Sequence, residues 1–289
     1  MLVHGGEQVF STPAFHQPIA ESHAPMSDLL AALLLGILEG FTEFLPVSST
    51  GHLLIAQHWL GARPDLFNIV IQAGAILATT LVFRRRIWAL ATGLRDRDNR
   101  DYAMKIAAAF GVTALVGLPV RLAGWELPET VSPVAIALIL GGFWMLLAER
   151  LAARRPESSH ITWTVAILVG LAQVVAGVFP GTSRSAAAIF IALLAGTGQR
   201  SAATEFVFLV GIPTMFAASG YALLEHFLDG NAAPVAWGEL GLAFAAATAT
   251  GFIAVRWLLG YIKQHSYAPF AFYRIALGVG LLLWLPAGG

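Results

Sequence analysis

The chain has 289 residues with 57% hydrophobic and 12% charged side chains, and its formal net charge is zero. A soluble domain of this length needs more polar surface, so the composition predicts a helical membrane protein with several spans and no nucleic-acid partner. The absence of cysteine excludes disulfide bonds and thiolate metal sites.

The first 25 residues are polar, and they lack the basic start and the continuous apolar core of a signal peptide. Met26 then opens an apolar stretch and would itself be a natural start. We therefore expect residues 1–25 to form a disordered extension, with a soluble regulatory tail as the alternative. Residues 26–289 are expected to form a single membrane domain.

The first apolar region, residues 29–60, consists of two short pieces separated by a cluster of Pro, Gly, Ser and Thr, and residues 161–198 show the same pattern. A broken backbone at membrane depth is tolerated only where it is buried in protein or lines a cavity, so both regions predict re-entrant helical hairpins. The remaining apolar runs are long enough to cross a bilayer. They cover residues 66–83, 103–121, 131–148, 203–222, 237–258 and 267–286. The predicted fold is an all-α integral membrane protein with six transmembrane helices and two re-entrant hairpins.

The distribution of basic residues supports this count of crossings. If both hairpins return to the side from which they enter, most Lys and Arg residues fall on one side, in the loops at 84–105, 149–160, 198–202 and 256–266. The opposite side contains Arg63 and Arg121. The positive-inside rule makes the basic side cytoplasmic. Both termini and the mouth of the first hairpin are then predicted to face outward.

The chain also contains an internal repeat. At a constant offset of 134 residues, Gly36, Glu39, Pro46 and Ser49 match Gly170, Gln173, Pro180 and Ser183. Each half, about 29–148 and 161–286, has one hairpin followed by three crossings, and because three is odd the second half is inverted. Inverted repeats place their shared site near the bilayer midplane. The two interrupted segments are therefore predicted to meet there.

The first interruption, EGFTEFLPVSSTGH at 39–52, begins with two carboxylates. Glu39 and Glu43 are four residues apart on a predicted helix, so they share one face. Two hard oxygen ligands on one face suit Mg²⁺ or Ca²⁺, especially when a substrate phosphate completes the coordination shell. The alternative is a structural pair bonded to the backbone or to Arg184.

The hydroxyl groups of the same segment precede a short apolar helix. Ser48, Ser49 and Thr50 would face its N-terminus, which favours an anion, although a serine cluster alone is more typical of a helix cap. His52 is placed to exchange a proton with a phosphoryl group. The neighbouring glutamates favour the functional interpretation.

The second interruption, PGTSRS at 180–185, adds a cation. Arg184 presents a rigid fork that matches phosphate oxygens, and Thr182 and Ser183 can surround the same anion. The alternative is that Arg184 pairs with a glutamate and binds nothing. Together the two segments offer metal ligands, an alcohol, a proton carrier and a phosphate clamp, which favours phosphoryl transfer.

The two motifs together resemble the undecaprenyl-diphosphate phosphatases, bacterial integral membrane enzymes also called bacitracin-resistance proteins. The resemblance extends from Met26 to the C-terminus and includes FNIVIQAGAILA, TEFVFLVGIP and PFAFYRIALG. It implies an inner-membrane enzyme that hydrolyses undecaprenyl diphosphate to undecaprenyl phosphate, the lipid carrier of peptidoglycan synthesis. It also implies functional roles for Glu39, Glu43, Ser49, His52 and Arg184, with Ser183 as a helper.

The sequence departs from this family's pattern at two positions. Ala186 replaces a glycine after the second motif, and Asn68 stands where an acidic residue is common. We expect only local effects. The type 2 phosphatidate phosphatases are a weaker match, because Phe190 stands where their motif requires histidine.

An alternative function is a lipid-phosphate or anion transporter, a flippase built on the same inverted repeat. The glutamate pair beside serine and histidine favours the enzyme. The nucleophile is open between Ser49, His52 and a metal-bound water; we favour Ser49, since Glu43 or His52 can take its proton. A second copy of the chain is a candidate partner.

Overall fold

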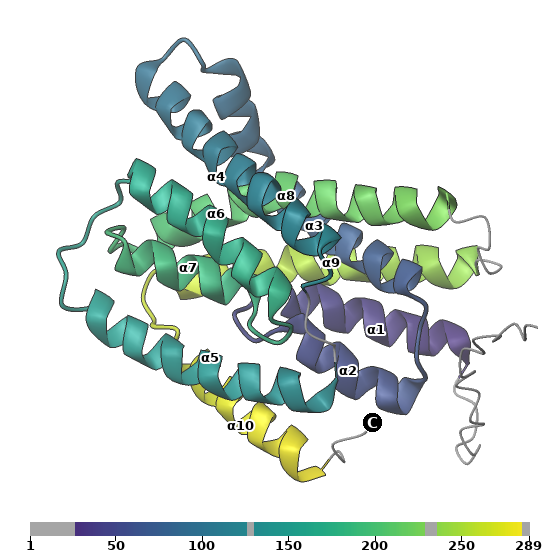
Figure 1. Cartoon of the computed structure of the whole chain (residues 1–289). Helices are drawn as coiled ribbons and strands as arrows, with labels where there is room; N and C mark the ends of the chain where they lie inside the picture. The colour runs from purple at the N-terminus through teal and green to yellow at the C-terminus, as the bar shows by residue number, and fades with distance from the viewer. Residues whose placement is uncertain (1–26, 126–129, 229–235, 285–289) are drawn as a thin grey trace, which may run out of the picture.

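The computed structural model describes residues 27–125, 130–228 and 236–284, so the expected extension at 1–25 lies outside the described residues. Within them the chain is helical and has no strand. The helices are α1 Asp28–Thr42, α2 Ser49–Leu60, α3 Asp65–Thr92, α4 Arg97–Leu122, α5 Val131–Ala152, α6 Trp163–Val178, α7 Arg184–Leu194, α8 Arg200–Leu228, α9 Trp237–Tyr261 and α10 Ala268–Trp284 (Figure 1).

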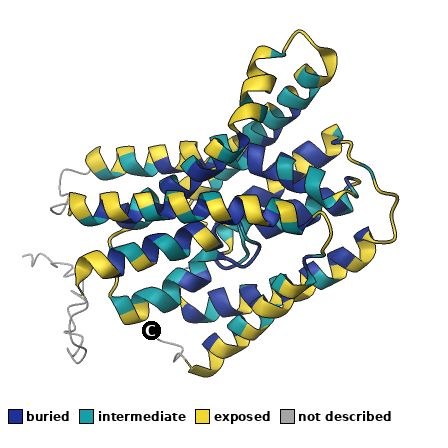
Figure 2. Cartoon of the chain, turned by 180° about the vertical axis from the view of Figure 1, so that it is seen from behind, coloured by how far each residue is buried: buried dark blue, intermediate teal, exposed yellow. Residues whose placement is uncertain are grey.

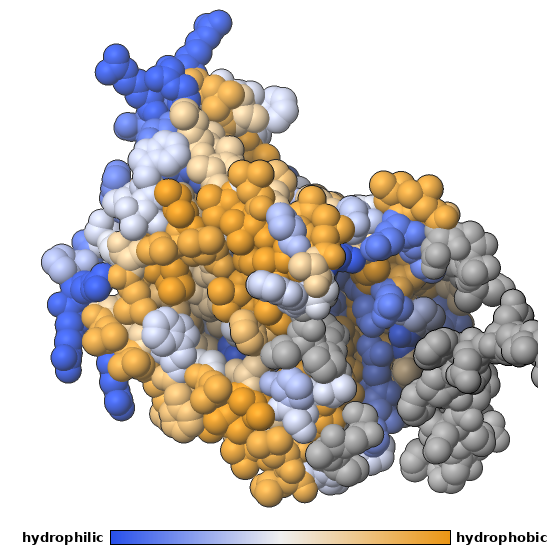
Figure 3. Space-filling model, viewed as in Figure 1, coloured by the Kyte–Doolittle hydropathy of each residue, from blue (hydrophilic) through white to orange (hydrophobic). Residues whose placement is uncertain are grey.

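The helices have the length and surface of a multi-pass membrane protein. Five of the described helices, α3, α4, α5, α8 and α9, are long and apolar enough to cross a bilayer. Their outward faces are apolar, and Leu115 on α4 is 79% exposed. Figure 3 shows hydrophobic residues across the middle of the molecule and hydrophilic residues toward its ends, while buried residues lie on the inner faces (Figure 2).

One expected loop is mostly helical. The sequence places a loop at 84–105, whereas α3 continues to Thr92 and α4 begins at Arg97. Asp96 caps α4 by accepting a hydrogen bond from the backbone N–H of Asn99 at 2.9 Å. Arginine is a good helix former, so basic residues outside the apolar run extend the helices. The α3–α4 hairpin therefore projects beyond the rest of the bundle (Figure 1).

The two interrupted regions form helical hairpins. The turn between α1 and α2 and the turn between α6 and α7 both lie inside the bundle, and they are reached from opposite ends (Figure 1). They touch, because the Ser185 hydroxyl donates a hydrogen bond to the carbonyl oxygen of Leu45 at 3.2 Å. The polar turns of the two hairpins therefore meet within the bundle.

Repeat-related glycines allow the first helix of each hairpin to pack closely on a neighbour. A Cβ atom at Gly36 of α1 would lie 2.3 Å from the carbonyl oxygen of Ala243 on α9. A Cβ atom at Gly170 of α6 would lie 2.5 Å from the carbonyl oxygen of Ala109 on α4. Small residues of this kind let helices approach where no hydrophobic effect drives them together. The equivalent glycines thus serve equivalent helix pairs.

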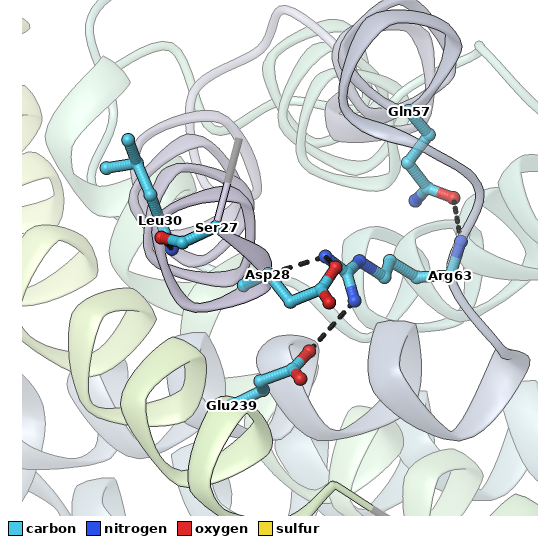
Figure 4. A network of polar contacts seen from close by, with 6 residues as sticks. All are labelled: Ser27, Asp28, Leu30, Gln57, Arg63 and Glu239. Atoms are coloured by element: carbon cyan, nitrogen blue, oxygen red, sulfur yellow. Dashed lines mark hydrogen bonds and ion pairs between the residues drawn. The ribbon is translucent and has the colours of Figure 1, made fainter. Parts of the chain in front are cut away.

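Ion pairs fix the two ends of the bundle. At one end Arg63, in the segment after α2, bonds to Asp28 at 3.2 Å and to Glu239 at 2.9 Å (Figure 4). At the other end Arg200 of α8 pairs with Glu149 of α5 at 2.6 Å. These contacts join segments far apart in the sequence and hold the hairpins between them.

Candidate active site

The carboxylates lie at the end of α1, deep in the protein. Glu39 is 1% exposed and Glu43 is 9% exposed. The backbone N–H of Glu43 donates to the carbonyl oxygen of Glu39 at 2.9 Å, which continues the helical turn beyond Thr42. A buried carboxylate is unfavourable without compensating partners. The partners of Glu43 come from both motifs.

Glu43 bridges the two hairpins. The Ser49 hydroxyl donates a hydrogen bond to Oε2 of Glu43 at 2.5 Å, and Nη2 of Arg184 lies 3.6 Å from Oε1. The first distance lies in the range of a charge-assisted O–H···O⁻ bond. The structure therefore brings together three of the residues that the sequence selects, and a carboxylate is in place to remove the proton of Ser49.

A serine in an uncommon backbone conformation immediately precedes each of the helices that follow the two turns. Ser48, at the N-cap position of α2, has φ 70° and makes no capping hydrogen bond through its side chain; Ser183, at the N-cap position of α7, has φ 67° and accepts a hydrogen bond from the backbone N–H of Ala186. Non-glycine residues rarely adopt positive φ, and such residues cluster at functional sites. The backbone conformation thus makes Ser183 equivalent to Ser48, whereas the sequence repeat at an offset of 134 residues pairs Ser183 with Ser49. The residues that follow, Ser49 and Arg184, consequently occupy equivalent first positions of their helices.

Both helix N-termini point into the same region. Unpaired backbone N–H groups and the helix dipole make such an end favourable for a phosphate. Arg184 and Ser49 are each the first residue of their helix and both approach Glu43. A phosphoryl group placed between them would meet a serine hydroxyl, a guanidinium group and two positive helix ends.

His52 is turned toward other partners. Its Nδ1 lies 2.7 Å from the carbonyl oxygen of Ser48, and its Nε2 lies 2.7 Å from the hydroxyl of Tyr273 on α10. A carbonyl oxygen only accepts hydrogen bonds, so Nδ1 carries a proton, and the neutral ring accepts the Tyr273 hydroxyl at Nε2. This arrangement holds the backbone of Ser48 in place.

The other predicted phosphate-binding residues lie around the turns. Thr50 and Ser183 are half-buried, and the Ser183 hydroxyl lies 3.1 Å from that of Ser185. Thr182 instead lines an apolar groove of about 870 Å³ between α5 and the α6–α7 hairpin. The groove therefore reaches the second motif two residues before Arg184.

Glu39 and Glu43 alone provide too few ligands for a metal ion, so a bound ion would also need ligands from the substrate. Among the described residues no group of three or more His, Cys, Asp or Glu side chains is arranged to hold an ion. Glu39, Glu43 and the Ser49 hydroxyl nonetheless provide hard oxygen donors, which fit Mg²⁺ or Ca²⁺ if phosphate oxygens and water supply the remaining ligands.

Comparisons with known proteins match most of the chain. The sequence model of the bacitracin resistance protein BacA family matches residues 32–280. The chain belongs to this family. It is 67% identical over 262 residues to proteins named undecaprenyl-diphosphatase from Xanthomonas oryzae pv. oryzae strain PXO99A and Xanthomonas campestris pv. campestris strain 8004, covering 91% of this chain and 99% and 100% of those proteins. A protein of the same name from Xylella fastidiosa strain 9a5c is 66% identical over 260 residues, covering 90% of this chain and all of that protein.

The two departures from the family pattern lie on α7 and α3. Ala186 is buried on α7, and its backbone N–H donates to the Ser183 hydroxyl at 3.3 Å. Asn68 of α3 accepts a hydrogen bond from the side chain of Gln57 at 2.9 Å. Neither side chain is bonded to Glu43, Ser49 or Arg184 in the described structure.

Three residues beside the motif turns have positions in the structure to which the sequence interpretation assigned no role. Tyr273 and Arg274 are consecutive on α10, and fully buried Arg274 donates from Nη2 to the carbonyl oxygen of Gly181 at 2.9 Å and to that of Ala137 at 3.3 Å. Tyr273 thus holds the first turn through His52, and Arg274 holds the second. A charged residue inside an apolar run was the available signal for Arg274. The third residue is Gln173 of α6, which lines a small pocket together with Glu43 and Arg184.

Proposed function

We propose that the protein hydrolyses undecaprenyl diphosphate to undecaprenyl phosphate and inorganic phosphate. This activity recycles the lipid carrier of peptidoglycan synthesis and confers bacitracin resistance. The observation that carries the proposal is the bridge from Ser49 through Glu43 to Arg184, which assembles a nucleophile, a base and an anion clamp from two separate motifs. Membership of the BacA family and the names of the relatives support the same substrate.

The geometry supports a two-step reaction at the terminal phosphorus. Ser49 Oγ attacks while Glu43 takes its proton; the bond to the bridging oxygen breaks, and undecaprenyl phosphate leaves. Arg184 and the N-termini of α2 and α7 stabilise the charge that develops on the phosphoryl oxygens. Water then attacks the phosphoserine, phosphate departs, and the serine oxygen regains a proton. Glu43 is the better base than His52, because both ring nitrogens of His52 are engaged elsewhere.

A divalent cation completes the proposed site. Glu39 and Glu43 would hold Mg²⁺ or Ca²⁺, and the bound cation would supply charge neutralisation for the diphosphate. Ser48, Thr50, Thr182 and Ser183 would contact phosphate oxygens around the two turns. We assign His52 to positioning the first turn, through its bond to the backbone of Ser48.

The proposed membrane arrangement has six transmembrane helices, namely α3, α4, α5, α8, α9 and α10. The α1–α2 and α6–α7 hairpins enter from opposite sides and return, which forms an inverted repeat. The positive-inside rule puts the basic connections in the cytoplasm of a bacterial inner membrane. The mouth of the first hairpin, with Ser49 and the glutamates, then faces the periplasm.

The apolar groove beside the second turn suits the prenyl chain of the substrate. It is lined by α5, α6 and α7 and reaches Pro180 and Thr182, next to Arg184. A hydrocarbon chain in this groove would leave the diphosphate near the helix ends. Association with a second copy of the chain stays a prediction.

The direct experiment is phosphate release from undecaprenyl diphosphate by the purified protein in detergent. We expect turnover in the wild-type protein and a loss of most activity in Glu43→Gln. A transporter with the same inverted repeat would instead move the lipid across vesicle membranes and release no phosphate. That outcome would reject the phosphatase.

A further inference from the structure

Gln173 lies in the proposed site with no partner in the described structure. It belongs to α6 and is 5% exposed, and neither its amide nitrogen nor its amide oxygen forms a hydrogen bond with a described residue. It lines a small pocket together with Glu43, Arg184 and Ser185. Buried polar groups in native proteins are nearly always hydrogen-bonded, so this amide needs a partner that enters the pocket.

The repeat places Gln173 opposite the glutamates. Gln173 is the counterpart of Glu39 at the offset of 134 residues, so the first hairpin supplies a carboxylate where the second supplies a neutral amide. A carboxylate at this position would repel an incoming diphosphate, whereas an amide N–H group can donate to one of its oxygens. The difference between the repeats therefore suits an anionic ligand on the side of Arg184.

We propose that Gln173 binds the terminal phosphoryl group of the substrate, with Nε2 donating to a non-bridging oxygen beside the Arg184 guanidinium group. The proposal rests on the proposed phosphatase function and adds a residue that touches the substrate. As charge builds on the phosphoryl oxygens the hydrogen bond strengthens, so Gln173 acts on the rate as well as on binding.

The test compares Gln173→Met with Thr79→Val in the purified full-length protein. Methionine keeps the length of the side chain and removes its hydrogen-bonding groups. Thr79 on α3 is a matched control: its hydroxyl is buried and has no partner among the described residues, and it does not line the pocket. The measurements are kcat/KM for undecaprenyl diphosphate, inhibition by methylenediphosphonate and the thermal midpoint.

We expect Gln173→Met to lower kcat/KM about 10²-fold and to weaken inhibition by the diphosphonate. Its thermal midpoint should stay equal or rise, because an apolar group replaces an unpartnered buried amide. Thr79→Val should leave both kinetic measurements unchanged. If Gln173→Met does not fold, Gln173→Glu keeps the shape, and charge repulsion should give at least as large a loss.

The proposal is overturned if a folded Gln173→Met protein keeps kcat/KM within about twofold of wild type. Unchanged kinetics in a folded Gln173→Glu protein would also overturn it. If the wild-type protein releases no phosphate, the phosphatase function fails separately. Inhibitor binding, measured by thermal shift, then still decides whether Gln173 contacts a diphosphate.

Discussion

Replacing Ser49 by alanine tests the proposed nucleophile most directly. The hydroxyl lies 2.5 Å from Oε2 of Glu43, which is close enough for direct transfer of its proton. A positioned general base contributes about 10² to 10⁴ in rate, and this contribution disappears with the group that it activates. We therefore expect Ser49→Ala to lower kcat by at least about 10³-fold, while Ser49→Thr retains a trace of activity.

The assay is phosphate release at saturating Mg²⁺, with Thr42→Val as the control. The Thr42 hydroxyl lies beside the site but donates to the carbonyl oxygen of Leu38 in its own helix, so its removal should leave turnover near the wild-type value. Rapid quenching with labelled substrate should place the phosphate on Ser49 by mass spectrometry. If Ser49→Ala keeps roughly a tenth or more of normal turnover, serine attack is wrong and His52 or water attacks instead.

Five further substitutions probe the surrounding structure. Glu43→Gln and Arg184→Ala should each lower kcat/KM about 10² to 10³-fold, and Glu39→Gln should also raise the Mg²⁺ concentration needed for half-maximal activity; near-normal turnover would refute the corresponding role. Arg274→Lys should lower kcat by a larger factor than it changes KM and reduce the free energy of unfolding by about 1–3 kcal/mol, because an ammonium group lacks the rigid planar fork that holds Nη2 at two carbonyl oxygens while Nη1 contacts Met145; unchanged kinetics would contradict a positioning role. A single cysteine at Thr50 should react with an impermeant thiol reagent from the periplasmic side, and reaction from the cytoplasm alone would reverse the proposed orientation.

Helix positions could be predicted from the sequence because apolar runs and their interruptions are local features. The expected interruptions at 39–52 and 180–185 coincide with the ends of α1 and α6 and the starts of α2 and α7. The loop at 84–105 was predicted too long, since charge ends an apolar run without ending a helix. Local patterns thus locate the hairpins better than they locate the ends of helices outside the apolar layer.

The arrangement within the candidate site depended on distant contacts that no local pattern contains. The hydrogen bond between His52 and Tyr273 joins residues 221 positions apart, and it gives Nε2 of His52 a partner that the spacing of the motif does not reveal. The sequence repeat aligns Ser183 with Ser49, whereas the positive φ values that Ser48 and Ser183 share align Ser183 with Ser48, one residue earlier. By contrast, the bridge from Glu43 to Ser49 and Arg184 follows from features in the sequence, because buried charges require partners.

The equivalence of Ser49 and Arg184 as first residues of α2 and α7 implies a division of labour between the halves. Two identical copies of the first half, assembled around the same axis, would place serine against serine and glutamate against glutamate. Such a symmetric pair would have two nucleophiles and no cation, and its carboxylates would repel a diphosphate. Arginine in place of serine and glutamine in place of glutamate in one half give the site an acidic side with the nucleophile and a basic side that binds the anion. A duplicated half could therefore acquire this chemistry only after its two copies were free to diverge in sequence.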